Sequence, residues 1–149
     1  MEAWQRCAET GIPLALLMVD VDCFKALNDA LGHLRGDECL RDIAKLCDGK
    51  VRGDSDLVAR YGGEELAVLL PGCPLDDAAR VAGRLCASVR ERQMPHPASP
   101  LGPYVTVSIG VSAAPFRGDV AAGVDYRGGS CLVCGQGRGS RLRRDRSCR

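Results

Sequence analysis

Apolar residues along the chain follow the two periods that distinguish strands from helices. Residues 13–22 (PLALLMVDVD) are a continuous apolar run ending in acids, which is typical of a buried central strand. Residues 56–61 (DLVARY) and 66–70 (LAVLL) flank a Gly-Gly tip, which predicts a β-hairpin. Residues 104–112 (YVTVSIGVS) alternate aliphatic and small polar side chains, which predicts a half-buried strand.

Helical periodicity fills the segments between these strands. Residues 23–33 predict a short helix that Gly32 closes, and residues 36–47 predict an amphipathic helix with Asp37 as its N-cap. A second amphipathic helix is expected after Pro74. The buried faces of the two amphipathic helices are Leu40, Ile43, Ala44 and Cys47, and Ala78, Ala82, Leu85 and Val89. The element order predicts an α/β (α+β) sandwich with an antiparallel sheet, similar to the ferredoxin-like folds.

Charge divides the chain into two regions. The sequence has 149 residues and 46% hydrophobic residues, which suits one globular domain. Residues 127–149 hold seven Arg and one Asp, so of the net charge of +1 the first 126 residues carry 1 − 6 = −5. We therefore expect a domain over residues 1–126 and a disordered Arg/Gly-rich tail over 127–149 that does not bind nucleic acid.

Cellular location and cysteine chemistry follow from the same composition. The longest apolar run is too short to cross a bilayer, so a cytoplasmic location without membrane contact is expected. Three of the nine cysteines, Cys39, Cys47 and Cys86, fall in apolar patterns and are predicted to be reduced core residues. Cys131 and Cys134 lack enough neighbouring ligands to form a zinc site.

The predicted hairpin tip combines bare backbone with negative charge. Gly62 and Gly63 permit positive φ and close approach of a ligand. Glu64 and Glu65 follow directly, and Asp20 ends the first strand, so these carboxylates converge if that strand neighbours the hairpin. Converging carboxylates favour a hard cation such as Mg²⁺, which also binds waters and substrate phosphates. A solvated acidic turn is the alternative.

Two strings extend this pattern to a known family. Residues 20–37 (DVDCFKALNDALGHLRGD) and 60–72 (RYGGEELAVLLPG) resemble the GGDEF family, the diguanylate cyclases, and residues 105–112 resemble its later strand. The resemblance covers roughly Trp4 to Ala114. It implies a palm-like sheet resembling nucleotide cyclases. It also implies an enzyme that condenses two GTP into cyclic di-GMP, releases two pyrophosphates and works as a homodimer.

The resemblance assigns roles around the acidic tip. It implies that Asp20, Glu64 and the Val21 carbonyl bind Mg²⁺, which offsets phosphate charge and helps activate the attacking hydroxyl. Glu64 or Glu65 is the candidate proton acceptor. Gly62–Gly63 is expected to make room for the nucleotide.

The resemblance assigns further roles to residues of the first string, 20–37. The resemblance implies that Asn28 and Asp37 read guanine, because an amide and a carboxylate match its edge of donors and acceptors. His33 contacts ligand or is a structural residue at a helix end. Lys25 stabilises phosphate charge or is a solvated helix lysine.

Three charged residues of the matched strings are expected to serve structure. Asp22 is predicted to cap the end of the strand, and Asp29 to pair within its helix. Arg60 is predicted to pair with a nearby acid rather than to touch ligand.

The sequence departs from the family at several points. Leu66 replaces the family's phenylalanine, which is a core substitution of similar character. The family's inhibitory product site is Arg-x-x-Asp, whereas Arg52 lies one residue too far from Asp56, so product inhibition there is not expected. The family's opening, Asp-x-Leu-Thr-Gly-Leu-x-Asn-Arg, is absent, and the chain is expected to begin inside the domain.

The largest departure is the missing family helix Ala-Asp-x-Ala-Leu-Tyr-x-Ala-Lys-x-x-Gly-Arg, whose Lys and Arg grip the triphosphate. Residues 128–141 (GGSCLVCGQGRGSR), back-translated and read one nucleotide forward, permit Ala-Asp-Arg-Ala-Leu-Tyr followed by Ala-Ala-Lys-Ala-Ala-Gly-Arg-Asp. We therefore hypothesise a frameshift between about Ala114 and Gly128. The alternative function is a catalytically defective module that binds GTP or a protein partner.

Overall fold

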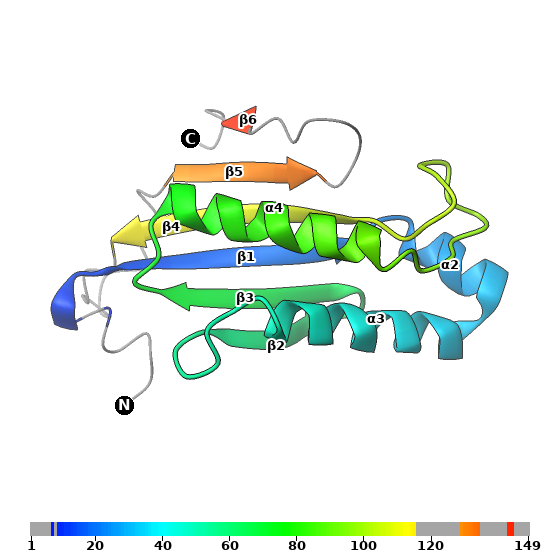
Figure 1. Cartoon of the computed structure of the whole chain (residues 1–149), viewed down its shortest axis with the longest axis horizontal. Coiled ribbons are helices and arrows are strands. Elements are labelled where there is room, and N and C mark those ends of the chain that lie inside the picture. Colours follow the sequence, from blue (N-terminus) through cyan, green and yellow to red (C-terminus); the bar gives the residue numbers. More distant parts are fainter. Residues whose placement is uncertain (1–6, 8, 116–128, 135–142, 145–149) are drawn as a thin grey trace.

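An antiparallel sheet with the strand order β2-β3-β1-β4-β5-β6 forms the centre of the computed structural model (Figure 1), which describes residues 7, 9–115, 129–134 and 143–144. The strands are β1 (Pro13–Val21), β2 (Leu57–Gly62), β3 (Glu65–Pro71), β4 (Val107–Pro115), β5 (Gly129–Cys134) and β6 (Arg143–Arg144). The helices are α2 (Phe24–Leu31), α3 (His33–Asp48) and α4 (Leu75–Glu91). This arrangement confirms the predicted α+β sandwich.

The core lies between one face of the sheet and the helices. Alternate residues of β1 and β4 are buried, and α3 and α4 pass over the same side of the sheet in Figure 1. The buried strand positions include Ala15, Leu17, Val19, Val107, Ile109 and Val111, and the predicted helical positions Leu40, Ile43, Cys47, Ala78, Ala82, Leu85 and Val89 are buried as well. Ala44, the remaining predicted position, is half-buried and packs against this core, so the two periods identified the core with one partial exception.

The junction between α2 and α3 differs from the prediction. Gly32 ends α2 with a φ of 86°, and α3 begins at the next residue, His33. Asp37 lies inside α3, so its assignment as an N-cap is wrong. The left-handed φ of Gly32 turns the chain directly into the new helix, whose first turn is closed by the Gly36 N–H bonding to the Gly32 carbonyl at 3.2 Å. The sequence pattern showed only the buried face of α3 and not this earlier start.

The segment before β4 forms a narrow stem. Regular pairing with β1 begins at Val107, three residues later than the sequence predicted. Tyr104 instead forms an isolated bridge with Pro95, and the Val105 N–H bonds to the Met94 carbonyl at 2.8 Å. Residues 94–96 and 103–105 therefore run side by side as a continuation of β4.

The predicted tail contains regular structure in part. Residues 129–134 form β5, which pairs with β4 along Ser108–Ala113, so the expectation of disorder is wrong for this segment. The edge of β4 offers unpaired N–H and C=O groups, and a neighbouring extended segment satisfies them. The remaining tail residues, apart from β6, lie outside the described residues.

Core burial determines the state of the cysteines. Cys39, Cys47 and Cys86 are buried in the core, as predicted. Burial raises the pKa of the Cys39 and Cys47 thiols to about 11, with a smaller contribution from neighbouring acids, so both are protonated at neutral pH. In the part of the chain that the structure describes, no helix is long and apolar enough to cross a membrane.

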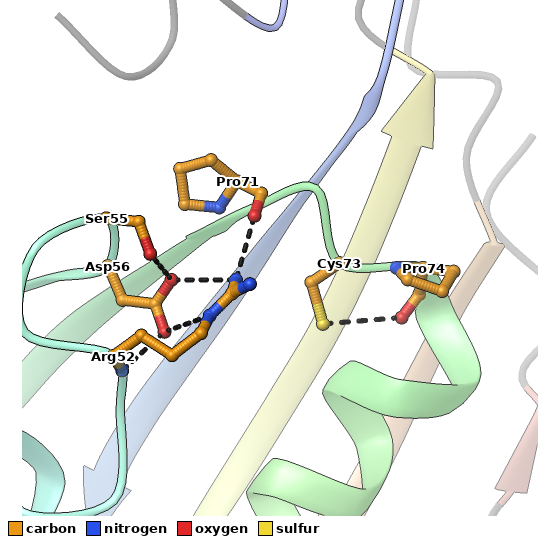
Figure 2. Close-up of polar contacts among 6 residues, drawn as sticks. All are labelled: Arg52, Ser55, Asp56, Pro71, Cys73 and Pro74. Atoms are coloured by element: carbon orange, nitrogen blue, oxygen red, sulfur yellow. Dashed lines mark hydrogen bonds and ion pairs between the residues drawn. The ribbon is translucent and has the colours of Figure 1, made fainter.

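A buried carboxylate anchors the loop before β2. Figure 2 shows Arg52 bonded to both oxygens of Asp56, at 3.3 Å from Nε and 3.0 Å from Nη2, and to the Pro71 carbonyl at 2.9 Å. The Asp56 side chain is only 3% exposed, and the Ser55 hydroxyl also bonds to it. Arg52 thus neutralises a buried charge and ties the loop to the end of β3.

We predict that Arg52→Met lowers the free energy of unfolding by about 1–3 kcal/mol, because the Asp56 carboxylate is left buried without its cation. Urea denaturation measures the change. Arg80→Met is the matched control: Arg80 pairs with Asp77, but both side chains are more than half exposed, so a change below about 0.5 kcal/mol is expected. Equal effects of the two substitutions would contradict the buried-charge account.

Candidate active site

Asp20 and the hairpin turn meet at the end of the sheet that lies next to α2 (Figure 1). Asp20 is the last residue but one of β1 and pairs with Glu65 of β3. Glu64 lies in the two-residue turn, Gly63–Glu64, between β2 and β3. The predicted proximity of the first strand to the hairpin is therefore confirmed.

The carboxylates of this edge interact electrostatically. The pKa of Asp20 is raised above its ordinary value of 3.8, mainly by burial and then by the negative charges of Glu64, Glu65 and Asp22. The three negative charges disfavour the ionised form of Asp20. A bound cation relieves this repulsion.

The donor set suits Mg²⁺ with substrate rather than a complete protein cage. Among the described residues, no group of three or more His, Cys, Asp or Glu side chains is arranged to hold a metal ion. The predicted set is smaller: the carboxylates of Asp20 and Glu64, and the carbonyl of Val21. Mg²⁺ takes its other ligands from waters and substrate phosphates, so this set fits it.

Arg60 holds the hairpin turn. Its guanidinium donates to the Gly63 carbonyl from Nε at 3.1 Å and from Nη2 at 2.7 Å, so the prediction of an acidic partner is wrong. The register shifts by one residue between Arg60 and Gly62, which is a β-bulge. A bulge increases local twist, and here the side chain folds back onto the turn.

The two glycines of the tip leave open space rather than supply positive φ. Gly62 and Gly63 are absent from the positive-φ residues of the described chain, so that part of the prediction is wrong. A Cβ built on Gly63 would meet nothing within 4 Å, and one on Gly62 would meet only Glu65 Oε2 at 3.8 Å. Room for close approach of a ligand is therefore present at both positions.

Asp22 fastens the β1–α2 turn. Its two carboxylate oxygens accept hydrogen bonds from the hydroxyls of Thr106 at 2.6 Å and Ser108 at 2.7 Å, and its N–H bonds to the Thr106 carbonyl at 3.0 Å. This supports the predicted structural role of Asp22. The partners were missed, although both hydroxyls fall on one face of the alternating segment 104–112.

Lys25 and Asp29 pair with each other along α2. The Lys25 Nζ lies 2.8 Å from Asp29 Oδ2, and both side chains are largely exposed. The pairing of Asp29 within its helix is thus confirmed. The phosphate contact of Lys25 stays a prediction.

Asn28 of α2 lies against Gly36 of α3. A Cβ built on Gly36 would overlap the Asn28 Oδ1 atom and would lie 3.1 Å from the Phe24 ring. The same Oδ1 atom is buried and has no hydrogen-bond partner among the described residues. Glycine at position 36 therefore leaves the space in which the Asn28 amide packs against α3. The contact of Asn28 with guanine stays a prediction.

Asp37 and His33 lie on α3 near this contact. Asp37 follows Gly36 directly, is half-buried and lines a pocket of about 210 Å³ with Arg41 and Arg60. His33, the first residue of α3, is exposed. Their contacts with a nucleotide stay predictions.

Comparison with known proteins identifies the family. The model of the GGDEF domain of diguanylate cyclases matches residues 1–124, so the chain belongs to the GGDEF family. The response regulator PleD of Caulobacter vibrioides is 42% identical over 117 residues, and diguanylate cyclase A of Treponema denticola is 38% identical over 119 residues. These matches cover 77% and 80% of this chain but only 25% and 31% of the two relatives.

Solved structures agree with the fold. The GGDEF domain of PA1120 (YfiN or TpbB) from Pseudomonas aeruginosa matches with a TM-score of 0.64 and 41% identity, covering 76% of this chain and 69% of that one. An active GGEEF domain of a diguanylate cyclase from Vibrio cholerae matches with a TM-score of 0.61 and 31% identity, covering 75% and 69%.

We predict that Gly36→Ala lowers the free energy of unfolding by about 1–3 kcal/mol, because the new methyl group overlaps the buried Asn28 amide. Gly83→Ala, in the interior of α4, is the control. Nothing lies within 4 Å of a Cβ there, so a gain of about 0.5–1 kcal/mol is expected. Chemical denaturation of both variants measures the change in the free energy of unfolding. A change of the same sign in both variants would contradict the close contact at Gly36.

Asp20→Asn is predicted to raise the melting temperature of the metal-free protein at pH 7. The folded-state pKa of Asp20 is above its ordinary value of 3.8. Protonated Asp20 therefore stabilises the fold fully below pH 3.8, and this stabilisation is lost as the pH rises through the folded-state pKa. The difference between variant and wild type should therefore disappear near pH 3. Asp54→Asn, in an exposed loop, is the control. A difference that persists at pH 3 would indicate a cause other than charge repulsion.

Proposed function

We propose that the chain is the catalytic core of a diguanylate cyclase, which condenses two GTP into cyclic di-GMP and releases pyrophosphate. The observation that carries the proposal is the convergence of Asp20 with Glu64 and Glu65 at one end of the sheet, where burial and then these charges raise the Asp20 pKa. The family match over residues 1–124 supports the same activity. The Vibrio cholerae relative described as active carries a GGEEF motif, so a glutamate at position 64 agrees with activity.

The acidic edge is the proposed metal site. Asp20, Glu64 and the Val21 carbonyl hold Mg²⁺ together with oxygens of the triphosphate. When bound, the ion offsets phosphate charge and lowers the pKa of the attacking hydroxyl. Arg60 contributes indirectly, because it fixes the turn that carries Glu64.

The chemical step is a nucleotidyl transfer between two GTP molecules. The 3′-hydroxyl of one GTP attacks the α-phosphorus of the other, the new P–O bond forms, and the bond to the β-phosphate breaks. Glu64 or Glu65 accepts the hydroxyl proton, and pyrophosphate leaves with the electron pair of the broken bond. A second, equivalent step closes the ring.

Substrate recognition is assigned to the two helices after β1. Asn28 and Asp37 bind the guanine edge, His33 lies at the rim of the same site, and Lys25 exchanges Asp29 for phosphate. Gly62–Gly63 leaves the open space through which the nucleotide reaches the metal.

The proposed assembly is a homodimer in which each subunit holds one GTP. The attacking hydroxyl and the α-phosphate belong to different nucleotides, and one acidic edge per chain supplies one metal site. The proposed location is the cytoplasm, where GTP is available.

A defective GTP-binding module is the second candidate. The family match ends at residue 124, and residues 129–134 form strand β5 where the family resemblance leads us to expect the Ala-Asp-x-Ala-Leu-Tyr helix. Without the lysine and arginine of that helix, the triphosphate loses two cationic contacts. Sequencing the coding DNA from the codon of Ala114 tests the frameshift: if the neighbouring frame does not encode that helix, the hypothesis is wrong.

We predict that the purified chain forms cyclic di-GMP from GTP and Mg²⁺, and that Glu64→Gln lowers the rate by at least about 100-fold by removing a metal ligand and proton acceptor. Chromatography of the nucleotide products measures the rate. Glu91→Gln, an exposed residue at the C-terminal end of α4, is the control and should match wild type. Unchanged turnover in Glu64→Gln would refute the metal assignment, and GTP binding without any product would favour the defective module.

A further inference from the structure

His96 is a buried polar residue that the proposed chemistry does not use. It is 1% exposed and is the one polar or charged residue among the buried residues that the structure describes. Its backbone is part of the stem before β4, where its N–H bonds to the Pro103 carbonyl at 2.8 Å. Its ring Nε2 lies 3.1 Å from the carbonyl oxygen of Cys23, which is distant in sequence.

The contact determines the tautomer of the ring. The Cys23 carbonyl can only accept, so Nε2 must carry the proton. Nδ1 is then left with a lone pair, and this atom is buried without a hydrogen-bond partner in the described part of the chain. An apolar side chain of similar size would fill the same space without an unpaired nitrogen. Packing alone therefore does not explain a histidine here, whereas its hydrogen bond to Cys23 does.

Cys23 is the strained residue of the β1–α2 turn. It has a φ of 55° and a ψ of 36°, in the left-handed region that residues with a side chain rarely adopt. It also precedes α2, and its carbonyl accepts the Leu27 N–H at 3.1 Å. The His96 bond is a second hydrogen bond to the same oxygen, and it holds the peptide group in this orientation.

Residues 96–108 form hydrogen bonds to two consecutive residues of this turn, Asp22 and Cys23. Thr106 and Ser108 bind the Asp22 carboxylate, Thr106 accepts the Asp22 N–H, and His96 donates to the Cys23 carbonyl. Because residues 94–96 pair with residues 103–105, the position of His96 depends on that of β4. The turn directly follows the proposed metal ligands of β1, Asp20 and Val21.

We propose that His96 is a positioning residue that holds Cys23 in the left-handed conformation and thereby orients the turn between the proposed metal ligands of β1 and Lys25 of α2. The inference rests on the proposed function for its effect on GTP. Its effect on the turn itself is independent of that function.

The test compares two variants of His96 with a core control. His96→Leu removes the donor, while His96→Gln places an amide N–H near the position of Nε2. Leu70→Val perturbs the core at the opposite end of β3, where Leu70 is 1% exposed. Backbone hydrogen exchange of residues 22–25 is measured in each, together with the affinity for GTP in the presence of Mg²⁺.

The expected result is faster exchange at residues 22–25 and a loss of GTP affinity of about 10- to 100-fold in His96→Leu only. His96→Gln should restore most of both. Adding Cys23→Gly to His96→Leu should also restore them, because glycine adopts positive φ without help from a neighbouring donor. A residue that only fills the core would not be rescued in this way.

Three outcomes would overturn the proposal: exchange in His96→Leu no faster than in Leu70→Val, no rescue by Cys23→Gly, or a ¹⁵N spectrum showing the wild-type ring proton on Nδ1. Should His96→Leu fail to fold, His96→Gln and the wild-type ring spectrum carry the test. If wild-type protein does not bind GTP, the proposed function fails, and the exchange data still decide the role of His96.

Discussion

The pairing of β1 on both sides is the constraint on which the rest of the structure depends. β1 lies between β3 and β4, and its alternate residues enter the core while the others face away from the helices. A slip of one residue would bury Asp20 and expose Val19 and Val21. The hydrophobic pattern of β1 therefore excludes registers that are shifted by one residue, and in the observed register Asp20 lies opposite Glu65 at the acidic edge.

The elements that sequence could predict are those whose signals are local. The apolar run of β1, the tip around Gly63 and the buried faces of the helices were correctly predicted, because a period of two or 3.6 residues is visible without knowledge of partners. The start of α3 was not correctly predicted, because it depends on the left-handed φ of Gly32. The bonds of Arg60 to the hairpin turn and of His96 to Cys23 depend on tertiary folding, and no short-range pattern encodes them.

The candidate site concentrates features that cost stability. Asp20 is repelled by neighbouring acids, Cys23 adopts a left-handed conformation, and the Asn28 acceptor is buried without a partner. Each is unfavourable alone, and the surrounding fold holds them in place. The hydrogen bonds to Asp22 and the ring of His96 supply this support from β4 and its stem. The residues in locally unfavourable states thus lie in or beside the proposed site.

The central claim is that β1 and the hairpin together form one cation site. The most direct measurement is paramagnetic relaxation by Mn²⁺, a stand-in for Mg²⁺, on isotopically labelled protein. The account predicts that backbone resonances of residues 20–22 and 63–65 broaden first and that excess Mg²⁺ reverses the effect. Broadening that begins elsewhere, for example around the acidic residues of α3, or that shows no preferred position, would contradict the account.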